Sequence, residues 1–452
     1  MMSRKETGCI LSFIIVPSIF VCLSGMLFYA PAGPEDFEVI GLENRENLKI
    51  LLQLYPLDPI LNDGQKTYFL IEKKYINELR DSCLNFTVET ARFAPFLIRQ
   101  TLSGLKTQGG LNGAYHSYQE TAQELKKLAS TYPSFSRLLI IGKSLEQRNI
   151  YALKISRNPG WDEEKPGVAF LGCHHAREWI SVEVPLLLGK YLLENYSSDS
   201  RVKNLVDSAV IWIIPLVNPD GLEYSILNYR LWRKNRRYNP DGSHGVDLNR
   251  NYSYAWGYDD YGSSPTPSSA VFRGASPFSE PETEAIRNFF SSRRLSAAVS
   301  YHSYSQMILY PWGYTDQPAE DEPLLAALAS EMAGLIYQVN GRLYQTGRAS
   351  SLLYVTNGDF TDWAYGTFRI PAFTIELPPV DLLEGGFLNS EDDINSIFLE
   401  NLPAALYLIE WAINYHQNSS ISNEGREKIK LEKKIKNVVK DKMGAIPPGR
   451  EF

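Results

Sequence analysis

Continuous apolar runs that alternate with helix-like segments decide which fold this chain can adopt. The runs predict strands at residues 168–171, 210–217 and 297–301, which lack the polar alternation of a strand with one wet face. A further strand, which carries Glu376, is predicted at residues 372–377. Apolar residues at helical spacing predict helices at residues 118–130, 182–196, 324–339 and 397–415. Strands without a polar face must be covered on both sides. The sequence therefore predicts an α/β fold, in which a mixed, mostly buried central β-sheet carries helices on both faces.

Composition divides the chain into four parts. Residues 1–32 carry Arg4 and Lys5 before a long apolar run and end in small residues, which predicts a signal peptide. A signal anchor is the alternative, because the run approaches the length that spans a bilayer. Residues 33–108 hold a small unit and a linker, residues 109–418 hold the sheet-forming pattern, and residues 419–452 form a charged tail. The leader predicts a location that is secreted or extracytoplasmic.

The small unit and the tail have simple local patterns. In the unit we expect strands at residues 37–40 and 68–71 and helices at residues 47–54 and 73–80, which makes it a small α+β fold. Two more strands, at residues 138–141 and 150–155, follow the glycine-rich linker. The lysine-rich tail is typical of a solvated helix or of disorder, and contact with an anionic cell surface is the alternative.

Charge and cysteine content exclude some classes of protein. The chain has 452 residues, a net charge of -7 and 44% apolar residues, which argues against nucleic acid as the main partner. Of its four cysteines only Cys173 lies in the 109–418 part, so no disulfide framework is expected there. Cys173 ends an apolar run, which indicates a buried, inert thiol.

One set of residues indicates a metal site. His175 and Glu178 stand three residues apart, directly after a predicted strand, and His302 follows another predicted strand. Two imidazoles and one carboxylate that leave a fourth position open are typical of catalytic zinc. His174 is also within one helical turn of Glu178, so the spacing alone leaves both histidines open as ligands.

The surroundings of these residues resemble a known family. The matching motifs, in order, are GCHHAREWI at 172–180, YRLWRKNR at 229–236, GVDLNR at 245–250, FRG at 272–274, PFSE at 277–280, SYHSY at 300–304, YPWG at 310–313 and FTIEL at 373–377. Together they resemble the metallocarboxypeptidases related to pancreatic carboxypeptidases A and B, over residues 115–416. Within that family, residues 353–366 are most similar to bacterial carboxypeptidase T.

The resemblance implies a catalytic centre with one Zn²⁺ per chain. His175, Glu178 and His302 would be the metal ligands. Asp247 would accept a hydrogen bond from His175, which fixes the tautomer of that ligand. Glu376 would be the general base that takes a proton from the attacking water and passes it to the leaving amine.

The resemblance also implies how a substrate is held. Arg233 would stabilise the oxyanion. Arg250 would bind the terminal carboxylate through two parallel hydrogen bonds, a geometry that lysine cannot offer. The remaining substrate contacts would come from Asn249 and Tyr354, which assist Arg250, and from Arg177, Arg230 and Tyr304 along the path of the peptide.

A pocket for the last side chain follows from the same alignment. Its walls would be Ala349, Thr356, Asp359, Phe360, Thr361 and Thr374. Thr361 stands on the floor, where B-type enzymes have an aspartate and A-type enzymes an isoleucine. Asp359 supplies one off-centre negative charge, and its alternative role is to cap the helix that begins there. The expected specificity is therefore mixed, for apolar and basic residues. Lys165 and Gly167 replace acidic residues of the carboxypeptidase T calcium loop, so no calcium is expected.

These expectations describe a secreted metallocarboxypeptidase made as a zymogen. The 33–108 part would be the propeptide and linker, with cleavage expected between Arg99 and Gly110, and the 109–418 part would be the catalytic domain. The partners would be peptide or protein C-termini, with no nucleic acid and no membrane partner beyond an N-terminal anchor, and the enzyme would be a monomer. Two alternatives stay open: a catalytically silent peptide-binding protein on this scaffold, and a carboxypeptidase of cell-wall peptides.

Overall fold

The computed structural model describes residues 37–43, 51, 59–62, 65–73, 76–81, 84–93, 112–161, 164–381 and 384–421. The predicted leader, the helix at 47–54 apart from residue 51, most of the linker, part of the 161–167 segment and almost all of the charged tail therefore lie outside the described residues. Cys173 is a free, buried cysteine, as its place at the end of an apolar run predicts.

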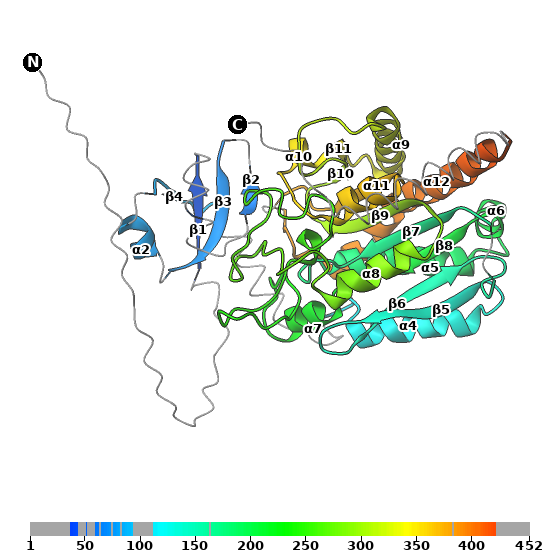
Figure 1. Ribbon diagram of the computed structural model, residues 1–452, viewed down its shortest axis with the longest axis horizontal. Coiled ribbons are helices and arrows are strands. Elements are labelled where there is room, and N and C mark those ends of the chain that lie inside the picture. The colour runs from blue at the N-terminus through cyan, green and yellow to red at the C-terminus, as the bar shows by residue number, and fades with distance from the viewer. Residues whose placement is uncertain are drawn as a thin grey trace, which may run out of the picture.

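The N-terminal unit is a small four-stranded sheet with the strand order β2-β3-β1-β4. Its elements, blue in Figure 1, are β1 (Phe37–Leu42), β2 (Pro59–Asn62), β3 (Thr67–Glu72), α2 (Ile76–Asp81) and β4 (Thr87–Val88). Ile40, Phe69 and Leu79 form part of its own apolar core. Both predicted strands are confirmed, whereas the helix expected at 73–80 begins only at Ile76.

The main body of the protein is built on an eight-stranded sheet with the order β11-β10-β12-β9-β7-β8-β6-β5. Its strands are β5 (Ser136–Lys143), β6 (Asn149–Ile155), β7 (Gly167–Gly172), β8 (Val210–Ile214), β9 (Leu295–Ser303), β10 (Met307–Tyr310), β11 (Gln345–Arg348) and β12 (Ala372–Leu377). The four central strands are parallel, β5 and β6 join antiparallel at one edge, and β10 runs antiparallel to β12 at the other. The mixed sheet confirms the predicted fold class.

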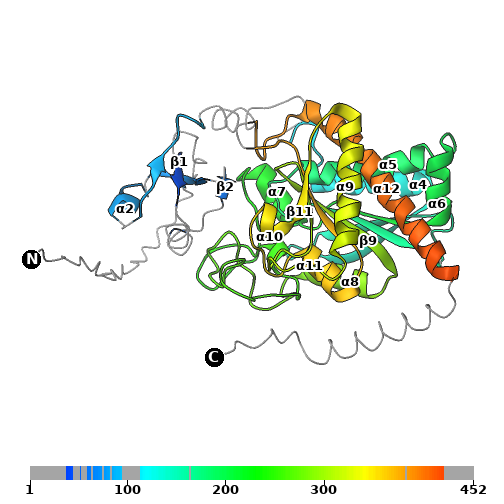
Figure 2. The ribbon, with the colours of Figure 1, turned by 90° about the horizontal axis from the view of Figure 1, so that it is seen from above.

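Helices cover both faces of this sheet (Figure 2). They are α4 (Tyr118–Thr131), α5 (Ile180–Glu194), α6 (Ser200–Ser208), α7 (Pro219–Leu227), α8 (Pro281–Ser291), α9 (Glu322–Asn340), α10 (Ala349–Leu352), α11 (Phe360–Phe368) and α12 (Ile394–Ile421), with the short 3₁₀ turns η3 (Leu248–Arg250) and η4 (Glu391–Asp393). Strand β8 shows why two layers are needed. Ile213 lies against Gly189 of α5, while the ring of Trp212 meets Phe289 of α8 at 4.9 Å.

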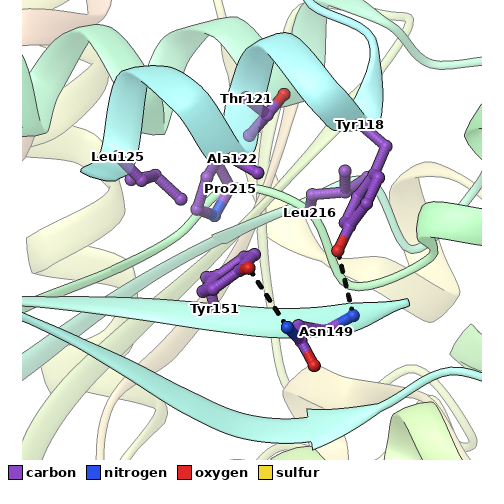
Figure 3. A pocket seen from close by; sticks show the side chains of 8 residues that line it. All are labelled: Tyr118, Thr121, Ala122, Leu125, Asn149, Tyr151, Pro215 and Leu216. Carbon is purple, nitrogen blue, oxygen red and sulfur yellow. Dashed lines mark hydrogen bonds between the residues drawn. The ribbon is translucent and has the colours of Figure 1, made fainter. Parts of the chain in front are cut away.

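Helix α4 shows how a local signal sets a boundary. Ser117 and Glu120 form a reciprocal capping box, which fixes the start of the helix. The helix then packs on β6, where the Tyr118 hydroxyl accepts a hydrogen bond from the Asn149 backbone nitrogen at 3.0 Å (Figure 3). The cavity below α4 measures about 10 Å³, which is room for about one water molecule, so no substrate site lies here.

Helix α12 closes the body of the protein. Among the described residues it is the one helix whose length and hydropathy would allow a membrane span, over Glu391–Gln417. However, 67% of its most apolar stretch is buried inside the protein, where the helix packs against α5 and α9. These features are those of a core helix.

Candidate active site

Three neighbouring parallel strands deliver the predicted chemical groups to one edge of the sheet. His175 and Glu178 follow the end of β7. His302 is the second-last residue of β9, and Glu376 is the second-last residue of β12. In the β9–β12 register Glu376 stands directly opposite His302. The carboxyl ends of parallel strands are where such sheets place their sites.

The metal-ligand candidates form one compact, buried cluster. The Nδ1 atoms of His175 and His302 lie 2.8 and 2.9 Å from the two carboxylate oxygens of Glu178, and 3.1 Å from each other. Burial favours the neutral acid, but the two imidazoles outweigh it and lower the pKa of Glu178. One nitrogen from each histidine and one carboxylate oxygen therefore converge on a single point.

The outer side of His175 is held by a buried ion pair. Its Nε2 lies 3.1 Å from Asp247 Oδ1, and Arg233 donates to Asp247 Oδ2 at 2.8 and 3.1 Å. Burial opposes the charge of Asp247, yet Arg233 and His175 hold the pKa of this carboxyl well below its ordinary value. With Nε2 directed at a carboxylate, the Nδ1 lone pair of His175 faces the cluster, as a zinc ligand requires. The residues present thus fit the zinc ion that the motifs imply.

His174 points away from this cluster. Its ring nitrogens lie 3.0 Å from Ser300 Oγ and 2.8 Å from the Tyr252 hydroxyl, and its side chain is fully buried. Of these two neighbours only His175 turns a nitrogen toward Glu178, so the geometry favours His175 as the ligand.

Glu376 is an almost fully buried carboxylate beside the cluster, with 8% of its surface exposed. Burial raises its pKa to about 8, with an additional contribution from the charge of Glu178, while His302 and Arg233 oppose the shift. A pKa near neutrality suits a group that must both accept and return a proton.

A buried arginine lies in η3, three residues after Asp247. Arg250 is 2% exposed, and its guanidinium donates to the backbone oxygens of Gly262 and Asn249 at 2.9 and 2.8 Å. The Asn249 side-chain oxygen accepts from the Phe360 backbone nitrogen at 2.9 Å. The ring of Tyr354, which is 40% exposed, lies 5.9 Å from the Arg250 guanidinium carbon.

Four of the predicted pocket residues, Thr356, Asp359, Thr361 and Thr374, are joined by hydrogen bonds at the start of α11. Asp359 is buried and caps the helix by accepting from the Asp362 backbone nitrogen at 2.8 Å, and Thr356 Oγ1 donates to it at 2.6 Å. Thr361 and Thr374 join their hydroxyls at 2.8 Å. Ala349 begins α10.

One pocket prediction needs correction. Phe360 is fully buried, and its ring lies 5.5 Å from His174 and 5.6 Å from Tyr252, so it belongs to the core behind the pocket instead of the wall. The sequence could not show this, because the first turn of α11 turns successive side chains to different sides.

Asp359 has a second carboxyl, Asp362, beside it. Burial and the charge of Asp359 raise the pKa of Asp362 well above its ordinary value, and burial also raises the pKa of Asp359. Asp362 accepts backbone hydrogen bonds from Gly313 and Tyr314. Because the two carboxyls interact, they titrate as a pair.

Known proteins are similar to this chain in sequence and in fold. The family model for zinc carboxypeptidases, Peptidase_M14, matches residues 121–404. This chain belongs to the zinc carboxypeptidase family. A zinc carboxypeptidase of Saccharothrix mutabilis subsp. capreolus is 38% identical over 279 residues, which cover 59% of this chain and 62% of that protein. Carboxypeptidase A4 of Mus musculus is 33% identical over 61% of this chain and 65% of its own length. The match thus spans less than two thirds of both relatives.

Solved structures agree with the family assignment. Carboxypeptidase A from Helicoverpa armigera superposes with a TM-score of 0.70 and 26% identity, over 84% of this chain and 97% of that chain. Thrombin activatable fibrinolysis inhibitor gives a TM-score of 0.69 and 25% identity, over 83% of this chain and 98% of that chain. The family that the motifs predicted is confirmed.

The residues expected along the peptide path share a partner that the sequence did not reveal. Phe387, in the loop after β12, lies under the Arg177 guanidinium at 4.0 Å and meets the Tyr304 ring at 4.8 Å. Arg230 donates to the backbone oxygens of Arg177 and Phe387 at 2.6 and 2.7 Å and stacks on Trp179 at 3.6 Å. Phe387 lies in no recognisable motif, so only the fold could bring it here.

Proposed function

We propose that this protein is a zinc-dependent metallocarboxypeptidase that hydrolyses the last peptide bond of peptides or proteins and releases single residues. The observation that carries the proposal is the buried His175–Glu178–His302 cluster, with Glu376 beside it and Arg250 in the same part of the fold. A silent peptide-binding scaffold would not need both a base and a complete ligand set.

Each residue has a distinct role in this reaction. Bound zinc would polarise the scissile carbonyl and acidify the attacking water. Glu376 accepts the proton of that water and donates it to the leaving amine. Arg233, oriented by Asp247, stabilises the charge that develops on the carbonyl oxygen. Arg250 binds the terminal carboxylate, assisted by the amide of Asn249 and the hydroxyl of Tyr354, and so limits cleavage to the last bond.

The test of the proposed function is metal-dependent hydrolysis of a blocked dipeptide. We expect one zinc per purified chain, loss of activity with a chelator, and recovery on adding one equivalent of zinc. A protein that binds zinc but hydrolyses neither simple peptides nor cell-wall peptides would contradict the enzyme assignment. Hydrolysis of cell-wall peptides alone would replace the proposed substrate class.

We further propose that the pocket accepts both apolar and basic side chains. Asp359 supplies one buried carboxylate, to which Thr356 Oγ1 donates a hydrogen bond. This charge favours Lys and Arg, and the uncharged walls accept apolar residues.

Asp359→Asn is expected to lower kcat/KM for C-terminal Lys and Arg by about 10-fold or more while that for C-terminal Leu changes little, because a buried charge partner is lost. Asparagine is as good an N-cap as aspartate, so α11 should keep its start. Rates on matched peptides ending in Arg and in Leu measure the effect. An equal loss on both peptides would mean that Asp359 only caps the helix.

We also propose that the 33–108 part is a propeptide and that the enzyme is secreted or extracytoplasmic and monomeric. The likeness to the insect carboxypeptidase covers 84% of the chain and so extends beyond residues 121–404. Hydrogen bonds hold the start of the catalytic part against the rest of it. The backbone nitrogens of Ala114 and His116 donate to the carboxylates of Glu391 and Glu183, both at 2.7 Å. Cleavage before residue 112 leaves these contacts intact.

Limited trypsin treatment is therefore expected to remove the N-terminal part and to raise activity. Arg99 and Lys106, both outside the described residues, are the expected cleavage sites. N-terminal sequencing of the product and its rate on a peptide measure the outcome. The double variant Arg99→Gln, Lys106→Gln should resist activation, and full activity of the intact chain would contradict the propeptide assignment.

A further inference from the structure

The two candidate zinc-ligating histidines have different supports on their outer nitrogens. His175 faces the carboxylate of Asp247, whereas His302 Nε2 lies 3.0 Å from the hydroxyl of Ser300, two residues earlier in β9. If Nδ1 of His302 binds zinc, as proposed above, its Nε2 carries the proton and donates to Ser300 Oγ. A serine hydroxyl can rotate, so it orients a ligand well only if a further partner holds it.

His174 supplies that further partner. Its Nδ1 lies 3.0 Å from Ser300 Oγ, and its ring stacks on the ring of His302 with centroids 5.6 Å apart and planes within 12°. The other nitrogen of His174 lies 2.8 Å from the Tyr252 hydroxyl. Every member of the series Tyr252, His174, Ser300 and His302 is at most 1% exposed, so water does not compete for these hydrogen bonds.

Tyr252 connects the series to a rigid part of the core. Its ring packs against Trp363 at 5.1 Å and Phe278 at 5.8 Å, and its backbone nitrogen donates to the Gly358 oxygen at 2.9 Å. Gly358 directly precedes the Asp359 cap of α11. The far end of the series is therefore fixed by the same segment that forms the proposed pocket.

We propose that Tyr252, His174 and Ser300 form a positioning chain that holds the His302 ring in the orientation that zinc binding requires. None of the three belongs to the ligand cluster and all three are fully buried, so they would act through His302. This inference rests on the zinc site proposed above. The positioning chain orients His302 through neutral groups, whereas the charged Asp247 orients His175.

The physical consequence is in metal affinity and ligand geometry. Groups that hydrogen-bond to a ligating histidine typically change metal affinity by about 10–100-fold when they are removed. Ser300→Ala removes the acceptor of His302 directly. Tyr252→Phe removes only the hydroxyl at the far end of the positioning chain, which leaves His174 less well fixed. It should therefore also weaken zinc binding, but by a smaller factor than Ser300→Ala.

The experiment measures zinc affinity by chelator competition and the absorption spectrum of the Co²⁺-substituted protein, on full-length chains. We expect Ser300→Ala to raise the zinc Kd by about 10–100-fold, Tyr252→Phe to raise it less, and both to alter the cobalt spectrum. Tyr301→Phe is the matched control, since it makes the same change at a neighbouring buried tyrosine that is not part of the positioning chain. Its Kd and spectrum should equal those of the unaltered protein.

A pair of variants at His174 separates positioning from packing. His174→Asn keeps a polar group near Ser300 and should retain most of the zinc affinity, whereas His174→Leu fills the space without a hydrogen bond and should lose it. Thermal melting identifies any variant that fails to fold. Unchanged Kd and cobalt spectra in Ser300→Ala and Tyr252→Phe would overturn the inference, whereas an unaltered protein that binds no zinc would overturn the proposed function instead.

Discussion

Glu376→Gln should lower kcat/KM by roughly 10²–10⁴-fold, because the amide retains the size of the side chain but can no longer accept the proton of the attacking water. Glu376 lies opposite His302 in the sheet and is 8% exposed, and neither β9 nor β12 contains another carboxylate that could take its place. Steady-state rates on a peptide with a free C-terminus measure the loss.

The control for this variant is its metal content. Glu376 is not one of the three clustered ligand candidates, so Glu376→Gln should bind one zinc with the affinity of the unaltered protein. Glu376→Asp keeps the carboxylate but shortens its reach, so its activity should lie between that of the unaltered protein and that of Glu376→Gln. A Glu376→Gln enzyme with near-normal kcat/KM would show that another group is the base.

Arg250→Ala should lower kcat/KM for peptides with a free C-terminus by about 10²–10³-fold, the cost of removing one partner of a buried, hydrogen-bonded charge pair. The unaltered enzyme should strongly prefer a free carboxylate to a C-terminal amide. The variant should lose most of that preference, because the group that distinguishes the two is gone. Rates on matched free and amidated peptides measure both effects.

Arg250→Lys separates charge from geometry. Lysine keeps the positive charge but lacks the planar fork, and it cannot reproduce the contacts with Gly262 and Asn249. We expect it to recover only part of the loss. If Arg250→Ala retained the preference for the free carboxylate, Arg250 would not be the clamp.

The sequence predicted the parts of the fold whose patterns are local. The run at 372–377 is mainly apolar, with only Thr374 and Glu376 polar, and β12 has those bounds in the structure. The strands after which His175 and His302 appear were predicted for the same reason, since a strand buried on both faces has few polar residues. Helices α6, α7 and α8 were not predicted, because α6 and α7 are short and their boundaries depend on caps such as Asp199 and Asn218.

Long-range pairings and side-chain directions could not be predicted. Spacing alone left both His174 and His175 open as ligands, and only the fold turns His174 toward Ser300 and Tyr252. Phe387 reaches Arg177 from a loop 210 positions further along the chain, and no periodic signal marks such a contact. Phe360 was expected in the pocket wall, whereas the packing of α11 places it in the core.

The most direct test of the central claim is mass spectrometry of a peptide digested by the cleaved protein, with its C-terminus either free or amidated. The account predicts stepwise loss of single residues from the C-terminus of the free peptide, little change in the amidated peptide, and no reaction after zinc is chelated. Internal cleavage, equal digestion of both peptides, or digestion that survives chelation would contradict it.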